Sequence, residues 1–434
     1  MTTTTTIQKI VVTPVAFHDP PLLNTVGVHE PFALRSIIEV ITESTYGLGE
    51  SYGDETHLAR LQKAADVITS SGLSVYNTNG IYGACLASLN KNTLNTKDTD
   101  DKDGKDDSMA GMVSPSLPDK LFSPFEVACL DIQGKLAGVP VSDLLGGRIR
   151  DNVPYSAYLF YKWASHPKHP GQTDEYGPAL SPEELVLQAS KMIKEYGFKA
   201  LKLKGGIFPP NDEIRAIRAL RSAFPTLPLR LDPNGAWTVQ TSKYVAKQLD
   251  GVLEYLEDPT PGLENMSAVT TTTNIPLATN MAVVSFPHLP PSIEKNAVQV
   301  VLSDHHFWGG LRKSQVLASL ASTFSIRLSM HSNSHLGISL AAMTHLAAAT
   351  PNLDYACDTH WPWKRQDEDV IVKEMEWVDG GVEVPKSPGL GVELDRKKLD
   401  SLHRLYLECG LQRRDDEGYM KSFQHDFSAE VPKW

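Results

Sequence analysis

The sequence has few cysteines and no long apolar run. Its four cysteines, Cys85, Cys129, Cys357 and Cys409, are widely scattered and form no C-x-x-C pair. This usage argues against a disulfide framework or a cysteine-based zinc site and is typical of a reducing compartment. No stretch of about 18 apolar residues occurs, and the amino-terminal residues lack the apolar core of a signal peptide. We therefore expect a cytoplasmic protein with no membrane partner.

Positive charge is also scarce. The chain has 41 lysines and arginines against 52 aspartates and glutamates, a net charge of −11. Such a balance argues against nucleic acid or an acidic membrane surface as a partner. An anionic substrate would need lysines, arginines or a metal ion gathered at its site. A chain of 434 residues is too long for one small core, so two domains, or a barrel with a cap, are expected.

From residue 153 onward, strand-like and helix-like segments alternate. Eight apolar strand-like runs are present, at residues 155–160, 200–204, 229–232, 253–258, 277–280, 298–303, 327–331 and 355–358. A doubly wound sheet would also alternate, but eight parallel strands are the number in a (β/α)₈ barrel. We therefore predict an α/β fold whose barrel spans residues 151–385 and carries the catalytic residues.

Residues 1–150 lack this repeat and are predicted to form an α+β capping domain. Residues 7–13 and 35–42 are typical of strands, and residues 55–69 are typical of an amphipathic helix. Residues 91–120 are polar, low in complexity and then rich in proline and serine, which predicts a flexible insertion. A calcium loop there would end on Ala110, where a glutamate is required. A helix is expected at 124–138, and residues 386–434 are expected to pack back on the cap.

Polar side chains stand at the carboxyl ends of successive barrel strands. Lys202 and Lys204 share one face of their strand, as do Asp232 and Asn234 around the next strand end, because side chains two apart point the same way. Parallel strands joined by a crossover helix end at one edge of the sheet. The other residues at these ends are Glu257, Asn280, Asp304, His331, Asn333 and His360. One such residue could be a turn or cap, but the full series indicates a functional rim.

Oxygen donors predominate among these residues. Asp232, Asn280 and either Glu257 or Glu264 would suit Mg²⁺, which binds oxygen ligands and keeps open water positions. The alternative is that Asp232 and Glu257 only cap turns and helices. No set of histidines and cysteines with zinc spacing competes with this interpretation.

Two bases are available beside this predicted metal site. Lys204 is the first, because the neighbouring Lys202 and a divalent cation would disfavour its charged form. His331 is the second, and a pairing with Asp304 would orient its imidazole. Bases on opposite sides of a metal-bound carboxylate fit proton abstraction α to that carboxylate, with the metal stabilising the enediolate.

At these residues the sequence resembles the enolase superfamily, specifically its glucarate dehydratase group. The matching motifs are L-K-L-K-G-G, L-D-P-N-G-A-W, L-E-D-P, L-A-T-N-M, S-D-H-H-F-W, H-S-N-S-H-L-G-I-S, A-C-D-T-H-W-P-W and G-L-x-x-R-D-D. Asn280 is informative, because most members have a carboxylate there while glucarate dehydratases use asparagine. The resemblance covers about residues 22–416 apart from the insertion. It implies a barrel with an α+β cap completed by the C-terminal segment, a Mg²⁺ cofactor and a homo-oligomer.

The resemblance also implies a role for each site residue. Lys204, tuned by Lys202, would take the proton from one C5 epimer, and His331, paired with Asp304, would serve the other and protonate the departing hydroxyl. Mg²⁺ would be bound by Asp232, Asn280 and a glutamate, for which Glu264 is favoured and Glu257 retained. The implied substrate contacts are Asn24, His29, Tyr158, Asn234, Asn333, His360 and Arg414.

The predicted function is therefore Mg²⁺-dependent dehydration of an acid sugar, converting D-glucarate or L-idarate to 5-keto-4-deoxy-D-glucarate. One alternative is a related aldarate or aldonate dehydratase, or an epimerase, of different specificity. Another is a non-catalytic binding homologue. The presence of both candidate bases and of every ligand type argues against the last.

Overall fold

Seven parallel strands form the central sheet of the computed structural model, which describes residues 5–89 and 112–434. In sheet order they are β13 (Arg327–Met330), β12 (Val300–Ser303), β11 (Leu277–Thr279), β10 (Tyr255–Glu257), β9 (Leu229–Asp232), β8 (Leu201–Lys204) and β7 (Ala157–Phe160). The expected eighth strand is a segment bridged to both sides, through Leu353 to Leu328 and through Cys357 to Tyr155. The barrel-type α/β fold is confirmed, with bridges in place of a regular eighth strand.

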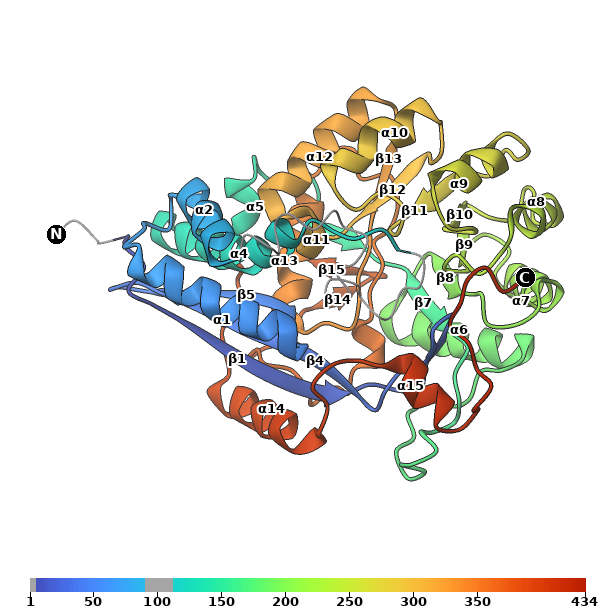
Figure 1. The fold of residues 1–434 in the computed structure, drawn as a ribbon, viewed down its shortest axis with the longest axis horizontal. Helices are drawn as coiled ribbons and strands as arrows, with labels where there is room; N and C mark the ends of the chain where they lie inside the picture. The colour runs from blue at the N-terminus through green and yellow to red at the C-terminus, as the bar shows by residue number, and fades with distance from the viewer. Residues whose placement is uncertain (1–4, 90–111) are drawn as a thin grey trace.

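Helices follow most of the strands and cover the outside of the curled sheet (Figure 1). They are α6 (Pro182–Tyr196), α7 (Pro210–Ala223), α8 (Val239–Gln248), α9 (Leu263–Thr270), α10 (Leu289–Glu294), α11 (His305–Trp308), α12 (Leu311–Thr323) and α13 (Gly337–Ala348). Helix α6 begins at a capping box of Ser181 and Glu184, and its core-facing side repeats at helical spacing in Leu185, Ala189 and Met192. No helix among the described residues has both the length and the apolar character that a membrane crossing needs.

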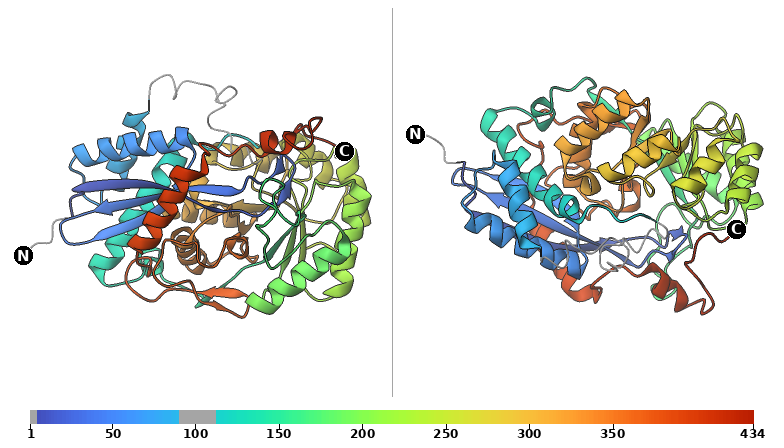
Figure 2. Two further views of the ribbon diagram at one scale, coloured as in Figure 1. Left: turned by 90° about the horizontal axis from the view of Figure 1, so that it is seen from below. Right: turned by 45° about the horizontal axis from the view of Figure 1, so that its top comes forward.

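The N-terminal region forms an antiparallel sheet of β1 (Lys9–His18), β4 (Phe32–Ile41) and β5 (Tyr46–Tyr52). Helices α1 (Glu55–Ser70), α2 (Thr78–Ser88) and α4 (Leu117–Ala137) pack with it, and α14 (Arg396–Cys409) lies across β1 (Figure 2). Shorter elements are β2 (Leu23–Asn24), β3 (Gly27–Val28), α5 (Val141–Leu144), β6 (Asn152–Pro154), β14 (Trp377–Val378), β15 (Gly381–Glu383), α15 (Asp416–Lys421), and the 3₁₀ turns Phe286–His288 and Trp361–Trp363.

Helix α4 starts earlier than the sequence predicted. Ser116 caps it by accepting from the Asp119 backbone N–H, and Pro118 lies in the first turn, where a proline costs no hydrogen bond. The predicted start at Pro124 is therefore wrong, because that proline lies inside the helix. The predicted insertion at 91–120 overlaps α4 at its end, and most of it lies outside the described residues.

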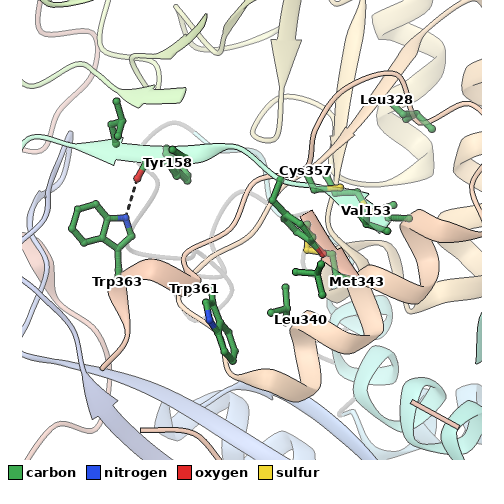
Figure 3. Packing of buried hydrophobic residues seen from close by; sticks show 14 of the residues in the cluster. Val153, Tyr158, Leu328, Leu340, Met343, Cys357, Trp361 and Trp363 are labelled. Atoms are coloured by element: carbon green, nitrogen blue, oxygen red, sulfur yellow. Dashed lines mark hydrogen bonds between the residues drawn. The ribbon is translucent and has the colours of Figure 1, made fainter. Parts of the chain in front are cut away.

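One buried hydrophobic cluster joins the N-terminal sheet to the barrel. It contains Val15 and Ile37 of the sheet as well as Tyr158 on β7 and Met343 on α13. Figure 3 shows its part beside β7, where the Trp363 indole N–H donates to the Tyr158 carbonyl at 2.9 Å. This packing holds the wall of the barrel from which Tyr158 reaches the rim.

Candidate active site

Lys204 ends β8 and is held by Asp232, which ends β9, and by Asn234, which follows that strand. Its Nζ donates to Asp232 Oδ2 and to Asn234 Oδ1, both at 2.8 Å. Asn234 has a left-handed backbone, with φ at 53°, a conformation that asparagine tolerates better than most residues. Its side-chain amide donates to Thr25 Oγ1 at 3.0 Å. The amine is therefore fixed at the carboxyl ends of β8 and β9, as the predicted convergence requires.

Lys202, two residues earlier, lies deeper among carboxylates. Its Nζ is 2.6 Å from both Glu257 Oε2 and Asp358 Oδ2, and 3.6 Å from Asp232 Oδ2. Burial opposes its charge, but the carboxylates of Asp358 and Glu257 outweigh burial and hold the pKa of Lys202 well above its usual value. Lys202 is thus a permanent cation beneath the rim.

Carboxylates outnumber ammonium groups in this buried cluster. The carboxylates are those of Asp232, Glu257, Asp258 and Asp358, and the ammonium groups are those of Lys202 and Lys204. Burial and nearby Asp232 raise the pKa of Asp258 to about 7, and burial raises the pKa of Glu257 well above its usual value. A divalent cation at this place would favour the charged forms of Glu257 and Asp258, which burial and the neighbouring carboxylates disfavour.

Asn280 connects the carboxylates with His331. With its amide nitrogen toward the carboxylates, it donates to Glu257 Oε1 at 3.1 Å and to Asp258 Oδ2 at 3.0 Å, and its oxygen accepts from His331 Nε2 at 2.9 Å. The reverse orientation would aim the amide oxygen at two carboxylates, which a cation between them would make favourable. The residues present therefore fit Mg²⁺, which Asp232, Glu257 and Asn280 would hold.

His331 follows β13 and is oriented by Asp304, which follows β12. The distance from His331 Nδ1 to Asp304 Oδ2 is 3.0 Å, and both side chains are buried. Burial opposes the charge of Asp304, but hydrogen bonds and charge from His306 and His331 hold its pKa well below the usual value. Because Nδ1 is engaged with Asp304, Nε2 is the nitrogen that faces Asn280 and the rim.

Four of the predicted substrate contacts lie on the barrel side of the site. The Tyr158 hydroxyl donates to Asp232 Oδ2 at 3.2 Å, and its ring lies 5.0 Å from that of His360. Asn333 lies two residues after His331, and its amide donates to the Tyr52 hydroxyl at 3.2 Å. Asn234 is already placed beside Lys204. Tyr158 and Asn234 thus lie on the Lys204 side of the site, and Asn333 lies on the loop that carries His331.

The remaining predicted contacts come from the N-terminal region and the C-terminal segment. His29 Nδ1 lies 3.0 Å from Asp19 Oδ2, and its ring lies 5.9 Å from that of Phe160 on β7. Asn24 donates to Asp416 at 3.0 Å, and Arg414 donates to the same carboxylate through two nitrogens at 2.9 and 2.7 Å. Asn24 and Arg414 are thus held together through Asp416, while His29 contacts Phe160 of the barrel.

The structure does not bring Glu264 to the other predicted ligands. Glu264 lies in the first turn of α9 with its side chain 76% exposed, 3.3 Å from Lys295 Nζ. Gly262, with φ at 81°, precedes α9 and directs this turn outward. Glu257, whose side chain is fully buried, lies with Asp232 and Asn280, whereas Glu264, the ligand favoured from the sequence, lies apart from them.

Sequence reasoning missed four residues that complete the site. They are Thr25, which binds Asn234; His306, which binds Asp304; Asp358, which binds Lys202; and Asp416, which binds Asn24 and Arg414. Asp358 carried a signal, because it ends the eighth strand-like run just as Asp232 ends another. The others lie on loops or in a short helix, where no periodic pattern marks them.

The comparisons with known proteins agree with this geometry. A family model described as Enolase C-terminal domain-like matches residues 184–398. A probable glucarate dehydratase of Streptomyces coelicolor is 48% identical over 440 residues, and the match covers 100% of both chains.

Two solved structures are similar over nearly the whole chain. An enolase from Gibberella zeae PH-1, complexed with magnesium, formate and sulfate, has a TM-score of 0.94 at 66% identity, covering 99% of this chain and 98% of that one. An enolase from Pseudomonas fluorescens Pf0-1, with bound magnesium, potassium and tartrate, has a TM-score of 0.92 at 47% identity, covering 99% of each chain. The chain therefore belongs to the enolase superfamily and, within it, to the glucarate dehydratase group of hydro-lyases.

Proposed function

We propose that the protein dehydrates D-glucarate, or its C5 epimer L-idarate, to 5-keto-4-deoxy-D-glucarate, with Mg²⁺ as cofactor. One observation carries this proposal. Lys204 and His331 come from different strands, and both contact the buried group of oxygen donors formed by Asp232, Glu257 and Asn280. A base on each side of a cation site is what proton abstraction from either epimer of an α-hydroxy acid requires.

Magnesium, when bound, would supply the positive charge that stabilises negative charge developing on the substrate carboxylate. Lys204 takes the C5 proton of one epimer onto Nζ, and Asp232 and Asn234 fix the direction of that amine. His331 Nε2 serves the other epimer, and as the imidazolium it gives a proton to the C4 hydroxyl, which leaves as water. The enol that remains becomes the keto product by gaining a proton at C4 and losing the proton of its C5 hydroxyl.

The names of similar proteins support the substrate class. The full-length relative is named a probable glucarate dehydratase, and one similar structure holds magnesium together with tartrate, a dicarboxylic hydroxy acid. We also propose a cytoplasmic location, supported by four cysteines that form no disulfide. The homo-oligomeric state stays a prediction.

The test is incubation with Mg²⁺ and a panel of aldarates and aldonates while the formation of 2-keto acid is followed. Turnover of glucarate or idarate is the expected result. Turnover of another acid sugar would assign a related dehydratase. Exchange of α-protons with D₂O without turnover would indicate an epimerase or a different substrate. A protein that shows neither activity would be a binding homologue, and the proposal would be wrong.

The two bases can be tested separately. His331→Asn removes the imidazole, so dehydration should be lost while the epimer deprotonated by Lys204 still exchanges its α-proton with D₂O. Proton NMR of each epimer in D₂O measures both rates. Loss of both exchanges would contradict two independent bases.

A further inference from the structure

A buried chain of polar side chains runs from the N-terminal sheet to His331. Glu50 on β5 accepts from Arg35 Nε on β4 at 2.8 Å, and Arg35 Nη2 lies 3.0 Å from His306 Nε2. His306 Nδ1 is 2.7 Å from Asp304 Oδ1, and Asp304 Oδ2 is 3.0 Å from His331 Nδ1. Every member is buried. The chain therefore reaches the predicted base from a part of the molecule outside the barrel.

The chemistry of Arg35 determines the hydrogen positions along this chain. A guanidinium has only donors, so His306 Nε2 accepts from it. The Ser339 hydroxyl lies 3.0 Å from the same nitrogen, and because its oxygen accepts from Arg35 Nη2 its hydrogen is available to donate to Nε2. The imidazole hydrogen of His306 is then on Nδ1, where it is donated to Asp304 Oδ1. The backbone N–H of His306 donates to the same oxygen at 2.9 Å. With Oδ1 satisfied by these two donors, Oδ2 of Asp304 is left to accept from His331.

The N-terminal sheet also holds the loop that carries His331. Glu50 accepts from the backbone N–H groups of Leu336 and Ser339 at 2.9 and 2.8 Å. These groups lie at the start of α13, which has its N-cap at Leu336, only five positions after His331. Arg35 and Glu50 thus act on His331 by two routes, through Asp304 and through the backbone.

A metal site is the competing interpretation of the same residues. Asp304, His305 and His306 place potential ligand atoms within 4.8 Å of one another. Arg35 donates to His306 Nε2, however, and both oxygens of Asp304 accept from histidines. The Nε2 lone pair of His306 and at least one lone pair on each oxygen of Asp304 therefore already have protein partners.

We propose that His306 is a positioning residue for His331, and that Arg35 of the N-terminal sheet sets its tautomer. By satisfying Asp304 Oδ1, His306 holds the carboxylate in the rotamer that keeps His331 Nε2 directed at the rim. Lys204, on the opposite side, has no part in this chain. The catalytic consequence rests on the proposed function, whereas the tautomer of His306 does not.

Two substitutions of His306 distinguish the effect of its hydrogen-bond donor from the effect of its ring volume. His306→Phe keeps a ring but loses both nitrogens, whereas the amide of His306→Asn can still donate to Asp304 from near the position of Nδ1. For the Phe variant we expect the α-proton exchange catalysed by His331 to fall about 10- to 100-fold. Exchange catalysed by Lys204 should stay within about twofold, and the Asn variant should recover most of the loss. The proposal would be overturned if the Phe variant lost the exchange catalysed by His331 and that catalysed by Lys204 equally, or if it lost neither.

A second measurement needs no substrate. In protein labelled with ¹⁵N-histidine, the resonances that disappear in His306→Phe should be those of an Nδ1–H tautomer. In Arg35→Met, which removes the donor to Nε2, this tautomer preference should weaken. An Nε2–H tautomer in the wild type would overturn the inference even if dehydration were observed. A wild type that exchanges no aldarate proton but shows the Nδ1–H tautomer would contradict the proposed function and support the inferred geometry.

Discussion

At the residue scale, two glutamates near the end of β10 differ in what they can bind. Glu257 is buried among lysines and carboxylates, whereas Glu264 is exposed and paired with Lys295. Glu257→Gln should weaken Mg²⁺ binding by about 100-fold or more and reduce turnover with it, because the site loses a charged oxygen donor. Isothermal titration with Mg²⁺, together with 2-keto acid formation, measures both effects.

The matched control is Glu264→Gln, which makes the same chemical change seven residues away. Its Mg²⁺ affinity should stay within about twofold of the wild type, since a pair this exposed contributes little. Weaker Mg²⁺ binding in Glu264→Gln than in Glu257→Gln would contradict the assignment of Glu257.

The same contrast shows which side-chain directions can be predicted from the sequence. Lys202 and Lys204 were predictable, because the period of two along a strand determines which side chains share a face. The outward direction of the Glu264 side chain could not be predicted, because it depends on the turn before α9. Asp258 there has φ at 37° and Gly262 has φ at 81°, and residue spacing does not reveal such backbone angles.

At the element scale, Arg35 and Glu50 join β4 and β5 to the start of α13. Both side chains are almost completely buried, and their ion pair measures 2.8 Å. Arg35→Met would leave Glu50 as a buried carboxylate without its cation, so the free energy of unfolding should fall by about 3–5 kcal/mol. Urea unfolding followed by circular dichroism measures the change.

A control for this substitution is Arg215→Met, which breaks an exposed pair with Asp212 in α7. Its cost should lie within about 1 kcal/mol, because exposed pairs contribute little. Similar losses of unfolding free energy in the two variants would show that burial does not increase the contribution of the Arg35 pair to stability.

A second element-scale prediction concerns the joint between α4 and α12. Glu126 on α4 accepts from the backbone N–H groups of Leu311 and Arg312, the first residues of α12, at 2.9 and 3.3 Å. Burial raises the pKa of Glu126 to about 7. The folded protein therefore holds this proton more tightly than the unfolded chain, and the contribution of Glu126 to stability falls as pH rises from about 4.5 to about 7.

Glu126→Gln removes this titration. Between pH 5 and pH 8.5 the stability of the variant relative to the wild type should shift in the variant's favour by up to about 3 kcal/mol. Urea midpoints of both proteins at the two pH values give this difference, and other titrating groups cancel. A relative stability that does not change with pH would mean that Glu126 ionises normally.

Elements with a strong hydrophobic period were predicted well, but the residues at which elements begin and end were not. The amphipathic helix expected at 55–69 is α1, Glu55–Ser70, because one apolar stripe runs through it. The start of α4 was misplaced because both Pro118 and Pro124 are compatible with a first helical turn. The eighth strand is reduced to bridges at Leu353 and Cys357, a loss of regular pairing that the apolar run does not reveal.

At the scale of the whole molecule, the predicted division into residues 1–150, 151–385 and 386–434 stays a prediction. The buried hydrophobic cluster that contains Val15 and Tyr158 runs across the first boundary. A second cluster, around Leu61 and Phe125, lies within the N-terminal region alone. The hydrogen bonds of Arg35 with His306 and of Glu50 with Leu336 and Ser339 also cross this boundary. We therefore expect the two regions to unfold together.

Magnesium tests this cooperativity, since the predicted ligands lie only in the barrel. At a free Mg²⁺ concentration about 100 times its Kd, the folded state should gain about 2.7 kcal/mol. If the two regions unfold as one unit, calorimetry shows a single transition that moves to higher temperature, and hydrogen exchange slows in β4 and β5 as well as in β8 and β9. At the same concentration Glu257→Gln should gain at most about 0.4 kcal/mol, so Mg²⁺ should barely change its transition temperature or its hydrogen exchange. Two transitions, of which Mg²⁺ moves only one, would mean that the N-terminal sheet folds independently of the barrel that it contacts.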